Sequence, residues 1–531
     1  MANQRLSMSR TFAVPDLTRT RSVAIDLARD WYGLPLAWLI GLVSALIYVT
    51  RPDVAWPIFD DSFISMTFAR NLAEHGKLSF DGVTWSTGAT SPLHVGVLAL
   101  LLKLGVAPIT ADVYVGVVSH AFLAAGTYLL AWSILRNRLA GLIAALLISF
   151  NNYAAMDAGN GLETSMFMAL LVFTMASYFL GKTPGWRLTT GVLTALCVLT
   201  RPEGAFLVPT FLLFRWMERG RLEPVNVYVR DAVLLAAPAT MAFGLYQLYA
   251  LIVSDHLGGT ANAKLQFFQE DKSPLMDRFG IAGDRIGLFI GPIVATLGLA
   301  LLAERRREFV LFGIFWVPVL MLYIITFPGG LDHYFYRYEH PVLPLLAVVA
   351  ASGVMQAIGW GMRNGAAQKA VVVGVLAVAA LATEQHYERW RILIYGQASY
   401  ETRTSLAAMA QELNTIIKPN EVLATHDIGA VGYYADYQVL DMVGLVNPAV
   451  LPYQKDRRVK EYLEMARPDY ILIFPDWDYY FLHIYPGDDP RFTLVKEYPG
   501  GLVRLSPYLL YKVNWDQPAP APAGGVLPAS P

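Results

Sequence analysis

Two adjacent aspartates, Asp60 and Asp61, follow an apolar segment in the stretch WPIFDDSFISMTFARNLAEHG at residues 56–76. Neighbouring carboxylates repel each other, and each loses hydration at a membrane boundary, so the pair needs a compensating reason. One aspartate is explained as an N-cap that accepts backbone N–H bonds. The other fits a general base that takes the proton of a hydroxyl nucleophile. With a helix beginning near Ser62, Asp61 is the better cap and Asp60 the better proton acceptor.

A further acidic position, Glu163, opens an apolar helix, and together with Asp157 it brackets the segment AGNG. A carboxylate at this place complements the positive end of the helix, an effect of about 0.3–1 kcal/mol. Glu163 also lies at the same predicted depth as the aspartate pair, where ionisable residues usually have a function. Both interpretations stay open.

Basic residues that could bind an anion follow further along the chain. In DHYFYRYEH, an aromatic belt explains the Tyr and Phe residues but not Arg337. A guanidinium at the membrane edge suits a lipid phosphate, because its donors are bidentate and permanently charged. His333 and Lys264 are weaker candidates for the same group. In TRPEG, Arg201 either serves this purpose or simply pairs with Glu203 to hold a helix break.

The composition indicates the setting of this chemistry. The chain has 531 residues, 55% of them hydrophobic and 16% charged, and a mean hydropathy of +0.41. Soluble proteins carry about 25% charged residues, so a polytopic membrane protein is predicted. The net charge of −1 gives no reason to expect nucleic acid as a partner. Cys197 is the only cysteine, which excludes an intramolecular disulfide and a cysteine-based metal site.

The pattern of apolar runs predicts an N-terminal cytoplasmic tail at 1–33 and a helical membrane domain at 34–384. About eleven spans are expected, near 34–51, 111–135, 139–153, 163–181, 187–200, 203–217, 230–253, 286–303, 308–327, 340–359 and 368–384. Lys and Arg concentrate in alternate loops, which puts those loops in the cytoplasm and the acidic motifs outside. This holds if the run 93–104, within the first outer loop 52–110, lies in the interface without crossing.

From residue 385 onward the composition becomes that of a soluble domain. EVLATHDIG, YQVLDMVG and DYILIF read as strands, and 401–417 and 457–466 as amphipathic helices. We therefore expect an extracytoplasmic α/β domain over 385–516. The Pro/Ala-rich end, 517–531, is expected to be disordered.

The motifs FDDSFI, GLETS, LTRPEG and YRYEHPVLPLL, in this order, resemble the GT-C superfamily of membrane glycosyltransferases, which use polyprenyl-phosphate-linked sugars. The first outer loop is most similar to the branch with arabinofuranosyltransferases and protein O-mannosyltransferase-like enzymes. The chain lacks the WWD-type motif of oligosaccharyltransferases, which argues against peptide N-glycosylation.

The resemblance implies an inverting transferase in the plasma (inner) membrane that acts on its outer face. It implies Asp60 as the base, with Asp61 and Glu163 as further catalytic candidates. Arg337, His333, Arg201 and Lys264 would then bind the donor phosphate, and Tyr338 and Asp427 the acceptor, which is a glycan or another hydroxyl compound. No cofactor is firmly expected; a divalent cation such as Mg²⁺ or Mn²⁺ would suit two aspartates, but two ligands are too few to define its site. A transporter of lipid-linked sugars and a non-catalytic assembly protein remain the alternatives.

Overall fold

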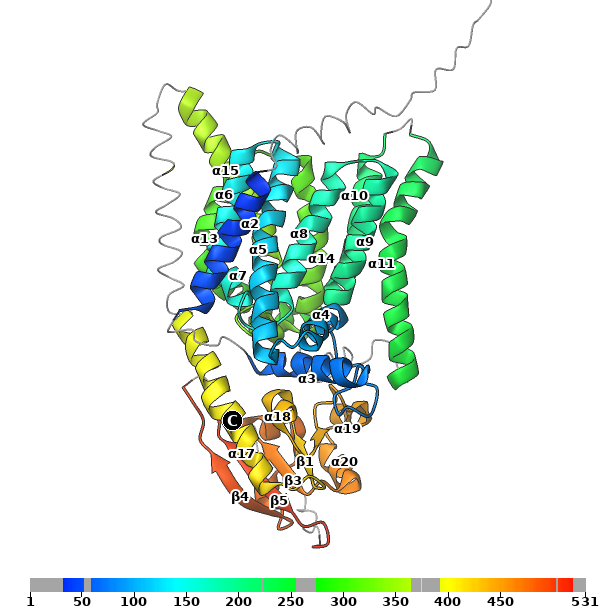
Figure 1. The fold of residues 1–531 in the computed structure, drawn as a ribbon, viewed down its shortest axis with the longest axis vertical. Helices are drawn as coiled ribbons and strands as arrows, with labels where there is room; N and C mark the ends of the chain where they lie inside the picture. Colours follow the sequence, from blue (N-terminus) through cyan, green and yellow to red (C-terminus); the bar gives the residue numbers. More distant parts are fainter. Residues whose placement is uncertain are drawn as a thin grey trace, which may run out of the picture.

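A computed structural model describes residues 32–51, 59–220, 223–254, 274–363, 374, 392–502 and 505–518. A bundle of helices forms most of the molecule, and a smaller α/β domain lies at one end of it (Figure 1). In chain order the bundle contains α2 (Gly33–Val49), α5 (Pro108–Leu135), α6 (Arg138–Ser149), α7 (Asn152–Asp157), α8 (Thr164–Leu180), α9 (Pro184–Thr200), α10 (Leu207–Glu218), α11 (Val225–Ser254), α13 (Leu275–Leu301), α14 (Val310–Thr326) and α15 (Val342–Arg363).

The bundle has the character of a membrane domain. Among the described residues, five helices are long and apolar enough to cross a membrane, namely α5, α11, α13, α14 with its preceding turn, and α15. Each predicted span from 34–51 to 340–359 overlaps a helix, whereas 368–384 lies almost entirely outside the described residues. The predicted polytopic helical architecture is confirmed. The number of eleven crossings stays a prediction.

Two helices lie where the bundle meets the α/β domain, α3 (Asp60–His75) and α4 (Pro92–Lys103) (Figure 1). The 12 residues of α4 extend about 18 Å, less than the ~30 Å of a hydrocarbon core, so α4 is too short to span it. Phe63 and Met66 of α3 belong to the core of the α/β domain, and the Arg70 guanidinium donates to the Tyr433 carbonyl at 3.1 Å. Helix α3 therefore joins the two parts of the molecule.

The α/β domain is built on a mixed sheet in the order β2-β1-β3-β5-β4. Its strands are β1 (Val422–Thr425), β2 (Gln438–Asp441), β3 (Tyr470–Ile473), β4 (Phe492–Tyr498) and β5 (Tyr508–Val513). The first three are parallel, and β5 is antiparallel to β3 and β4. The three predicted strands are confirmed. The β4–β5 hairpin was not predicted, because the central residues of β4 are exposed or half-buried and give no alternating pattern.

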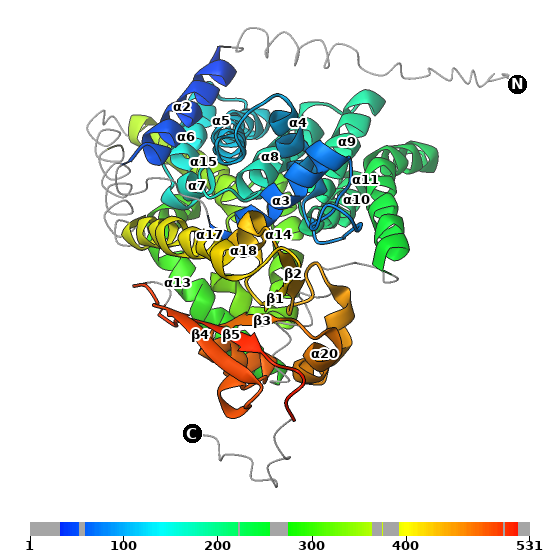
Figure 2. The ribbon, with the colours of Figure 1, turned by 60° about the horizontal axis from the view of Figure 1, so that its bottom comes forward.

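Helices cover both faces of this sheet. On the side facing the bundle lie α17 (Ala407–Ile416), which continues a π-helical turn at Thr402–Leu406, and α18 (Gly429–Tyr434) (Figure 2). The other face is covered by α20 (Val459–Ala466), and α19 (Leu451–Lys455) and α21 (Pro475–Trp477) are short connections. The α/β character predicted for this part of the chain is thus confirmed, and α17 and α18 form the side that meets α3.

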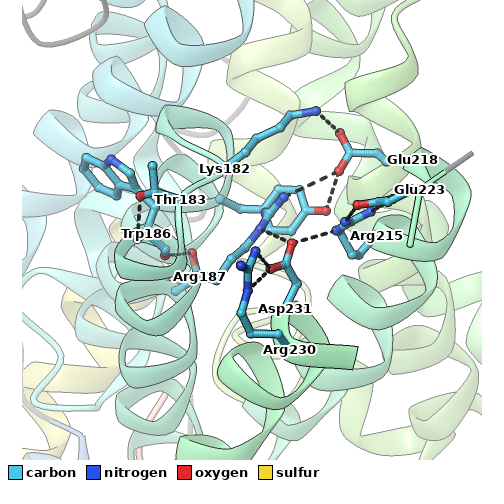
Figure 3. Close-up of polar contacts among 11 residues, drawn as sticks. Lys182, Thr183, Trp186, Arg187, Arg215, Glu218, Glu223, Arg230 and Asp231 are labelled. Atoms are coloured by element: carbon cyan, nitrogen blue, oxygen red, sulfur yellow. Dashed lines mark hydrogen bonds and ion pairs between the residues drawn. The ribbon is translucent and has the colours of Figure 1, made fainter. Parts of the chain in front are cut away.

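At the end of the bundle opposite the α/β domain, ion pairs link α9, α10 and α11 (Figure 3). Arg187 is only 1% exposed, and its Nε lies 3.6 Å from Asp231 Oδ2. Arg215 Nε donates to the same oxygen at 3.1 Å, and Arg230 Nη2 donates to Asp231 Oδ1 at 2.9 Å. These residues belong to or adjoin the Lys/Arg-rich segments for which a cytoplasmic position is predicted.

Candidate active site

Asp60 is the first residue of α3, and its side chain points toward the α/β domain. The Ala430 N–H donates to Asp60 Oδ1 at 2.8 Å, at the start of α18. A Cβ on Gly429 would lie 2.3 Å from Asp60 Oδ2, so only glycine fits there. The helix begins two residues earlier than the predicted Ser62, and its N-cap is Phe59. This corrects the reason for preferring Asp60 as the proton acceptor: its own carboxylate accepts a helix N–H, that of Ala430 in α18, so capping no longer favours Asp60 over Asp61.

Asp61 lies among cationic and aromatic side chains of the segment that precedes α15. Its Oδ2 is 3.6 Å from Arg337 Nη2 and 3.9 Å from His333 Nε2. The Tyr334 hydroxyl donates to Asp61 Oδ1 at 3.2 Å. The Asp61 side chain is 24% exposed, whereas Asp60 is 3% exposed. Each of the two neighbouring carboxylates therefore has its own compensating group, the Ala430 N–H for Asp60 and the Arg337 guanidinium for Asp61.

The backbone just before Arg337 has an unusual conformation. Tyr334, Phe335 and Tyr336 have φ values of 45°, 61° and 68°, three successive side-chain-bearing residues in the left-handed region. Such residues cost of order 1 kcal/mol or more each and persist only where their surroundings hold them. Phe59 supplies part of that support, since its ring stacks on Tyr334 at 4.8 Å and on Phe335 at 5.9 Å between centroids. The turn directs Arg337 toward the carboxylate pair.

Arg337 and Arg201 come from segments far apart in the sequence and lie on the same aromatic ring. Their guanidinium carbons are each 5.1 Å from the centroid of Tyr338. Arg337 is buried, and its Nε has no hydrogen-bond partner among the described residues. Arg201 Nη2 donates to Glu203 Oε1 at 2.6 Å, so the local ion pair considered from the sequence is present. Arg201 nevertheless stays beside Arg337, because both guanidinium groups lie against Tyr338.

Glu163 also belongs to this group. Its Oε1 lies 3.9 Å from Arg201 Nε, and the Arg201 Nη1 donates to the Thr164 hydroxyl at 3.5 Å. Glu163 is the residue that precedes α8, so its carboxylate lies at the positive end of that helix. The position of Glu163 is thus compatible with both interpretations, a carboxylate that stabilises the helix end and a carboxylate with a function in the site.

Two cavities lie near the carboxylate pair, and Asp60 lines one of them. The one we call the basic cavity has a volume of about 200 Å³ and is lined by Arg201, Arg337, Glu163, Glu203, Tyr323 and Tyr338, among others. The one we call the acidic cavity has a volume of about 520 Å³, and its lining includes Asp60, Asp332, Glu401, Tyr334, Tyr498 and Tyr508. Asp61 connects them, since it contacts Arg337 of the first and Tyr334 of the second.

The remaining predicted site residues have varied positions. His333 lies near Asp61, as given above, and Lys264 is outside the described residues. Tyr338 was expected on the acceptor side, but it lines the basic cavity between the two arginines. Asp427 accepts a hydrogen bond of 2.5 Å from the Tyr508 hydroxyl and so lies directly behind the wall of the acidic cavity. Their functional roles stay predictions.

Two residues of the quoted motifs, Asp157 and His340, were not among the predicted site residues, yet they connect its loops. His340 Nε2 lies 2.8 Å from the Phe335 carbonyl oxygen, inside the left-handed turn. Asn160 Nδ2 donates to Asp157 Oδ1 at 2.9 Å, and the Phe59 N–H donates to the Asn160 carbonyl at 3.2 Å. The two side chains also contact each other, since His340 Nδ1 lies 2.7 Å from Asp157 Oδ2. Both residues stand in motifs quoted from the sequence, but their separation along the chain made this contact unpredictable.

The described residues offer no ready metal centre. No three His, Cys, Asp or Glu side chains within them are placed to hold one ion. Asp60 is bonded to α18, and Asp61 faces Arg337, so the pair does not turn both carboxylates toward a common point. The divalent cation considered from the sequence stays a prediction, and no step below depends on it.

Comparison with known proteins gives a domain match and several fold matches. Residues 389–514 match a family model described as a domain of unknown function (DUF8728). No curated protein matches the chain by sequence. The crystal structure of ArnT from Cupriavidus metallidurans bound to undecaprenyl phosphate is similar with a TM-score of 0.53 and 15% identity, over 91% of this chain and 98% of ArnT.

A second similar protein is the Archaeoglobus fulgidus oligosaccharyltransferase. Its apo crystal structure matches with a TM-score of 0.51 and 11% identity, over 85% of this chain and 70% of the other. The same enzyme tethered with an acceptor peptide matches with a TM-score of 0.51 and 12% identity, over 92% and 74%. The chain therefore has the fold of ArnT and of this oligosaccharyltransferase, the GT-C-type fold that its motifs predicted.

Proposed function

We propose that the protein is a GT-C-type glycosyltransferase that moves a sugar from a polyprenyl-phosphate donor to a hydroxyl acceptor. The observation that carries the proposal is the basic cavity, in which Arg201 and Arg337 converge from separate segments beside the carboxylate pair. Guanidinium groups are suited to phosphate because they offer several charged donors in a fixed geometry. The fold supports the proposal, since ArnT, which shares it, was crystallised with undecaprenyl phosphate.

In the mechanism we propose, the donor phosphate lies in the basic cavity and the acceptor hydroxyl enters from the acidic cavity. Asp60 lines the acidic cavity and takes the proton of the acceptor hydroxyl as that oxygen bonds to the anomeric carbon. The bond from this carbon to the phosphate oxygen breaks, and its electron pair leaves with the lipid phosphate. Direct displacement of this kind inverts the anomeric configuration. Removal of the proton by a carboxylate is worth about 10²- to 10⁴-fold in rate.

The two arginines stabilise the charge on the departing phosphate. Arg337 has an unpaired Nε for this purpose, whereas Arg201 is oriented by Glu203 and lies near Glu163. Preorganised charged donors in a buried site are among the largest contributions to catalysis. Asp61 orients Arg337, and Glu163 offers a carboxylate to the hydroxyl groups of the donor sugar.

The resembled branch suggests arabinofuranose or mannose as the sugar, and the Lys/Arg distribution suggests that transfer takes place on the outer face of the plasma membrane. A reporter enzyme that is active only in the cytoplasm, fused after Asn514, should be inactive. A periplasmic reporter at the same position should be active. The reverse pattern would contradict the outward orientation.

Transfer itself is tested with the purified protein and radiolabelled polyprenyl-phosphate arabinofuranose and mannose. We expect release of polyprenyl phosphate and a labelled product with at least one donor when a hydroxyl acceptor is added. A transporter would move intact labelled lipid across a vesicle membrane without breaking the sugar–phosphate bond. A non-catalytic assembly protein would do neither, and either result would overturn the proposal.

A further inference from the structure

The two arginines of the basic cavity are already paired with carboxylates. Arg201 Nη2 donates to Glu203 Oε1 at 2.6 Å, and its Nε lies 3.9 Å from Glu163 Oε1. Arg337 Nη2 lies 3.6 Å from Asp61 Oδ2. These carboxylates offset much of the positive charge that the guanidinium groups would otherwise present to an anion. A phosphate in this cavity therefore needs a further source of positive potential.

The first turn of α4 lies at this cavity and supplies such a potential. Thr90 and Ser91 line the cavity, and Ser91 is the N-cap of α4. The N–H groups at the start of a helix have no partner within it, and together with the helix dipole they amount to roughly half a positive charge. The first turn of α4 contains no Asp or Glu. Within the described part of the chain, neither the Leu93 N–H nor the His94 N–H has a hydrogen-bond partner.

Two buried side chains without a partner line the same cavity. Ser91 is 4% exposed, and its hydroxyl makes no hydrogen bond to any described residue. Arg337 is also 4% exposed, and its Nε has no partner among the described residues. Buried polar groups are normally hydrogen-bonded, so these two donors indicate a ligand with several acceptor oxygens. A phosphate group has such oxygens, and in a cavity of about 200 Å³ it cannot lie far from either donor.

Apolar side chains complete the wall of the cavity. Phe206, Leu322 and Phe327 line it beside the charged groups. Leu322 belongs to α14, a helix long and apolar enough to cross a membrane. A phosphate attached to a hydrocarbon chain would bury this apolar surface, which a free phosphate would leave in water. The lining therefore favours a lipid phosphate over inorganic phosphate.

We infer that the start of α4, through the Ser91 hydroxyl and the unpaired N–H groups of its first turn, binds the phosphate of the polyprenyl donor together with the two arginines. The inference rests on the proposed function, because it concerns the donor of the same reaction. When the bond from the anomeric carbon to the phosphate oxygen breaks, its electron pair stays on that oxygen. The lipid phosphate thereby changes from a diester with one negative charge to a monoester with about two. The positive end of α4 thus stabilises the departing phosphate more than the intact donor, which lowers the barrier.

The test changes only the charge at the start of α4. Ser91→Asp and Ser91→Asn introduce side chains of nearly equal size, and both residues are good N-caps, so α4 should stay folded in each variant. Undecaprenyl phosphate binding is measured by isothermal titration on the detergent-purified full-length protein at about pH 8, where aspartate is ionised. We expect Ser91→Asp to bind at least about 10-fold more weakly than Ser91→Asn, because the carboxylate occupies the positive helix end and repels the phosphate. Equal affinities of the two variants would overturn the inference.

Thr183 provides a matched control at the other end of the bundle. Like Ser91 it precedes a proline, and it is the N-cap of α9, where its hydroxyl oxygen accepts the Trp186 N–H at 3.5 Å (Figure 3). Thr183 lines neither cavity, so Thr183→Asp and Thr183→Asn should bind undecaprenyl phosphate equally. Undecaprenol, the same lipid without the phosphate, should bind the two Ser91 variants equally. If Thr183→Asp also weakened undecaprenyl phosphate binding, or Ser91→Asp weakened undecaprenol binding, the charge would not act on a phosphate at α4, and the inference would fail.

The transfer assay separates this inference from the proposed function. If undecaprenyl phosphate binding differs between the Ser91 variants as expected but no labelled sugar is transferred, the transferase fails and the phosphate site stands. If transfer occurs but the two Ser91 variants bind undecaprenyl phosphate equally, the inference fails and the transferase stands. If the wild-type protein binds inorganic phosphate but not undecaprenyl phosphate, the inference and the donor part of the proposal both fail.

Discussion

The imidazole Nδ1 of His340 lies 2.7 Å from Asp157 Oδ2, and both side chains are 1% exposed. This contact joins the segment before α15 to the segment before α8, and through Asn160 it reaches Phe59, next to the aspartate pair. The three loops that carry the candidate base, Glu163 and Arg337 are therefore held to one another by a buried polar contact. Rate is sensitive to such positioning, because a misplacement of about 1 Å can cost about 10²-fold.

We expect His340→Gln and Asp157→Asn each to lower kcat for sugar transfer by about 10- to 100-fold. Neither residue lines the acidic or the basic cavity, so the loss would come from displacement of the left-handed turn and Arg337. His75→Gln, at an exposed histidine of α3, serves as the control. Activity is compared at a temperature where each variant is fully folded. If both variants had the kcat of wild type under these conditions, His340 and Asp157 would not position the catalytic groups and would only stabilise the fold.

Asp60→Asn should lower kcat by about 10²- to 10⁴-fold, because the amide cannot take the acceptor proton. It retains an oxygen that can accept the Ala430 N–H, so the α/β domain should stay docked. Single-turnover transfer with saturating donor gives the chemical rate. A variant with near-wild-type turnover would remove Asp60 from the role of base and direct attention to Asp61 and Glu163.

Asp61→Asn should have a smaller effect on kcat and leave undecaprenyl phosphate bound at least as tightly as in wild type. The carboxylate lies 3.6 Å from Arg337 Nη2, so its removal takes a like charge away from a bound phosphate. Isothermal titration with undecaprenyl phosphate measures this. Binding weakened more than 3-fold would show that Asp61 helps to hold the donor in some other way.

Arg337→Lys should weaken undecaprenyl phosphate binding about 10-fold, a loss of about 1.4 kcal/mol. Lysine keeps the charge but not the planar fork. Arg201→Lys should weaken it less and lower the melting temperature more, because Arg201 already donates twice to Glu203. The control is Arg458→Lys, a half-exposed arginine of the α/β domain. If Arg201→Lys weakened undecaprenyl phosphate binding more than Arg337→Lys, Arg201 would be the main phosphate-binding residue.

At the other end of the bundle, Asp231→Asn should destabilise the protein more than Arg187→Met. The asparagine would leave Arg187, Arg215 and Arg230 without the carboxylate they share, and breaking a buried ion pair from one side costs about 3–5 kcal/mol. In Arg187→Met, Asp231 keeps two guanidinium partners. Thermal unfolding in detergent ranks the variants, and undecaprenyl phosphate affinity should not change in either. A larger loss in Arg187→Met would contradict the central place of Asp231.

Asp441 and Asp489 should give the α/β domain pH dependences of opposite sign. Burial raises the pKa of Asp441 to about 6, although N–H groups of Val446 and Val443 bond its carboxylate. A pKa that is higher in the folded state stabilises the fold below about pH 4, and this contribution is lost as the pH rises through 6. Burial alone would also raise the pKa of Asp489, but hydrogen bonds from Arg491 and Lys460 outweigh it and hold the pKa below its usual range. That stability is present above about pH 4 and is lost on further acidification.

Hydrogen exchange of strands β1 and β3, corrected for intrinsic rates, measures these effects in the full-length protein. Between pH 4 and 7, Asp441→Asn should abolish part of the decline in protection, up to about 3 kcal/mol for a pKa moved from 3.8 to about 6. Asp489→Asn should lower protection near neutral pH and make it less sensitive to acid. Unchanged pH profiles in both variants would contradict the two assignments.

The membrane character, the positions of most helices and the motifs that carry the chemistry could all be predicted from the sequence. These depend on local properties: apolar runs of spanning length, and charged residues such as Asp60, Arg201 and Arg337 at the ends of those runs, where their cost in hydration has to be compensated. Strands β1, β2 and β3 were predictable for the same reason, since each is a short run of largely apolar residues between turns. Strand β4 was not predicted, because it lies at the sheet edge and carries exposed Leu494 and Val495, and β5, although it is an apolar run of the same kind, was missed with it.

The assembly of the site could not be predicted, because it depends on contacts between distant segments. Which aspartate meets which partner depends on α18 docking against α3, and the contact between Asp60 and Ala430 joins residues 370 positions apart. The contact of His340 with Asp157 and the shared position of Arg201 and Arg337 on Tyr338 are long-range in the same way. Local sequence rules report the propensity of a segment and its burial, but side-chain pairing between loops is set by how the helices pack.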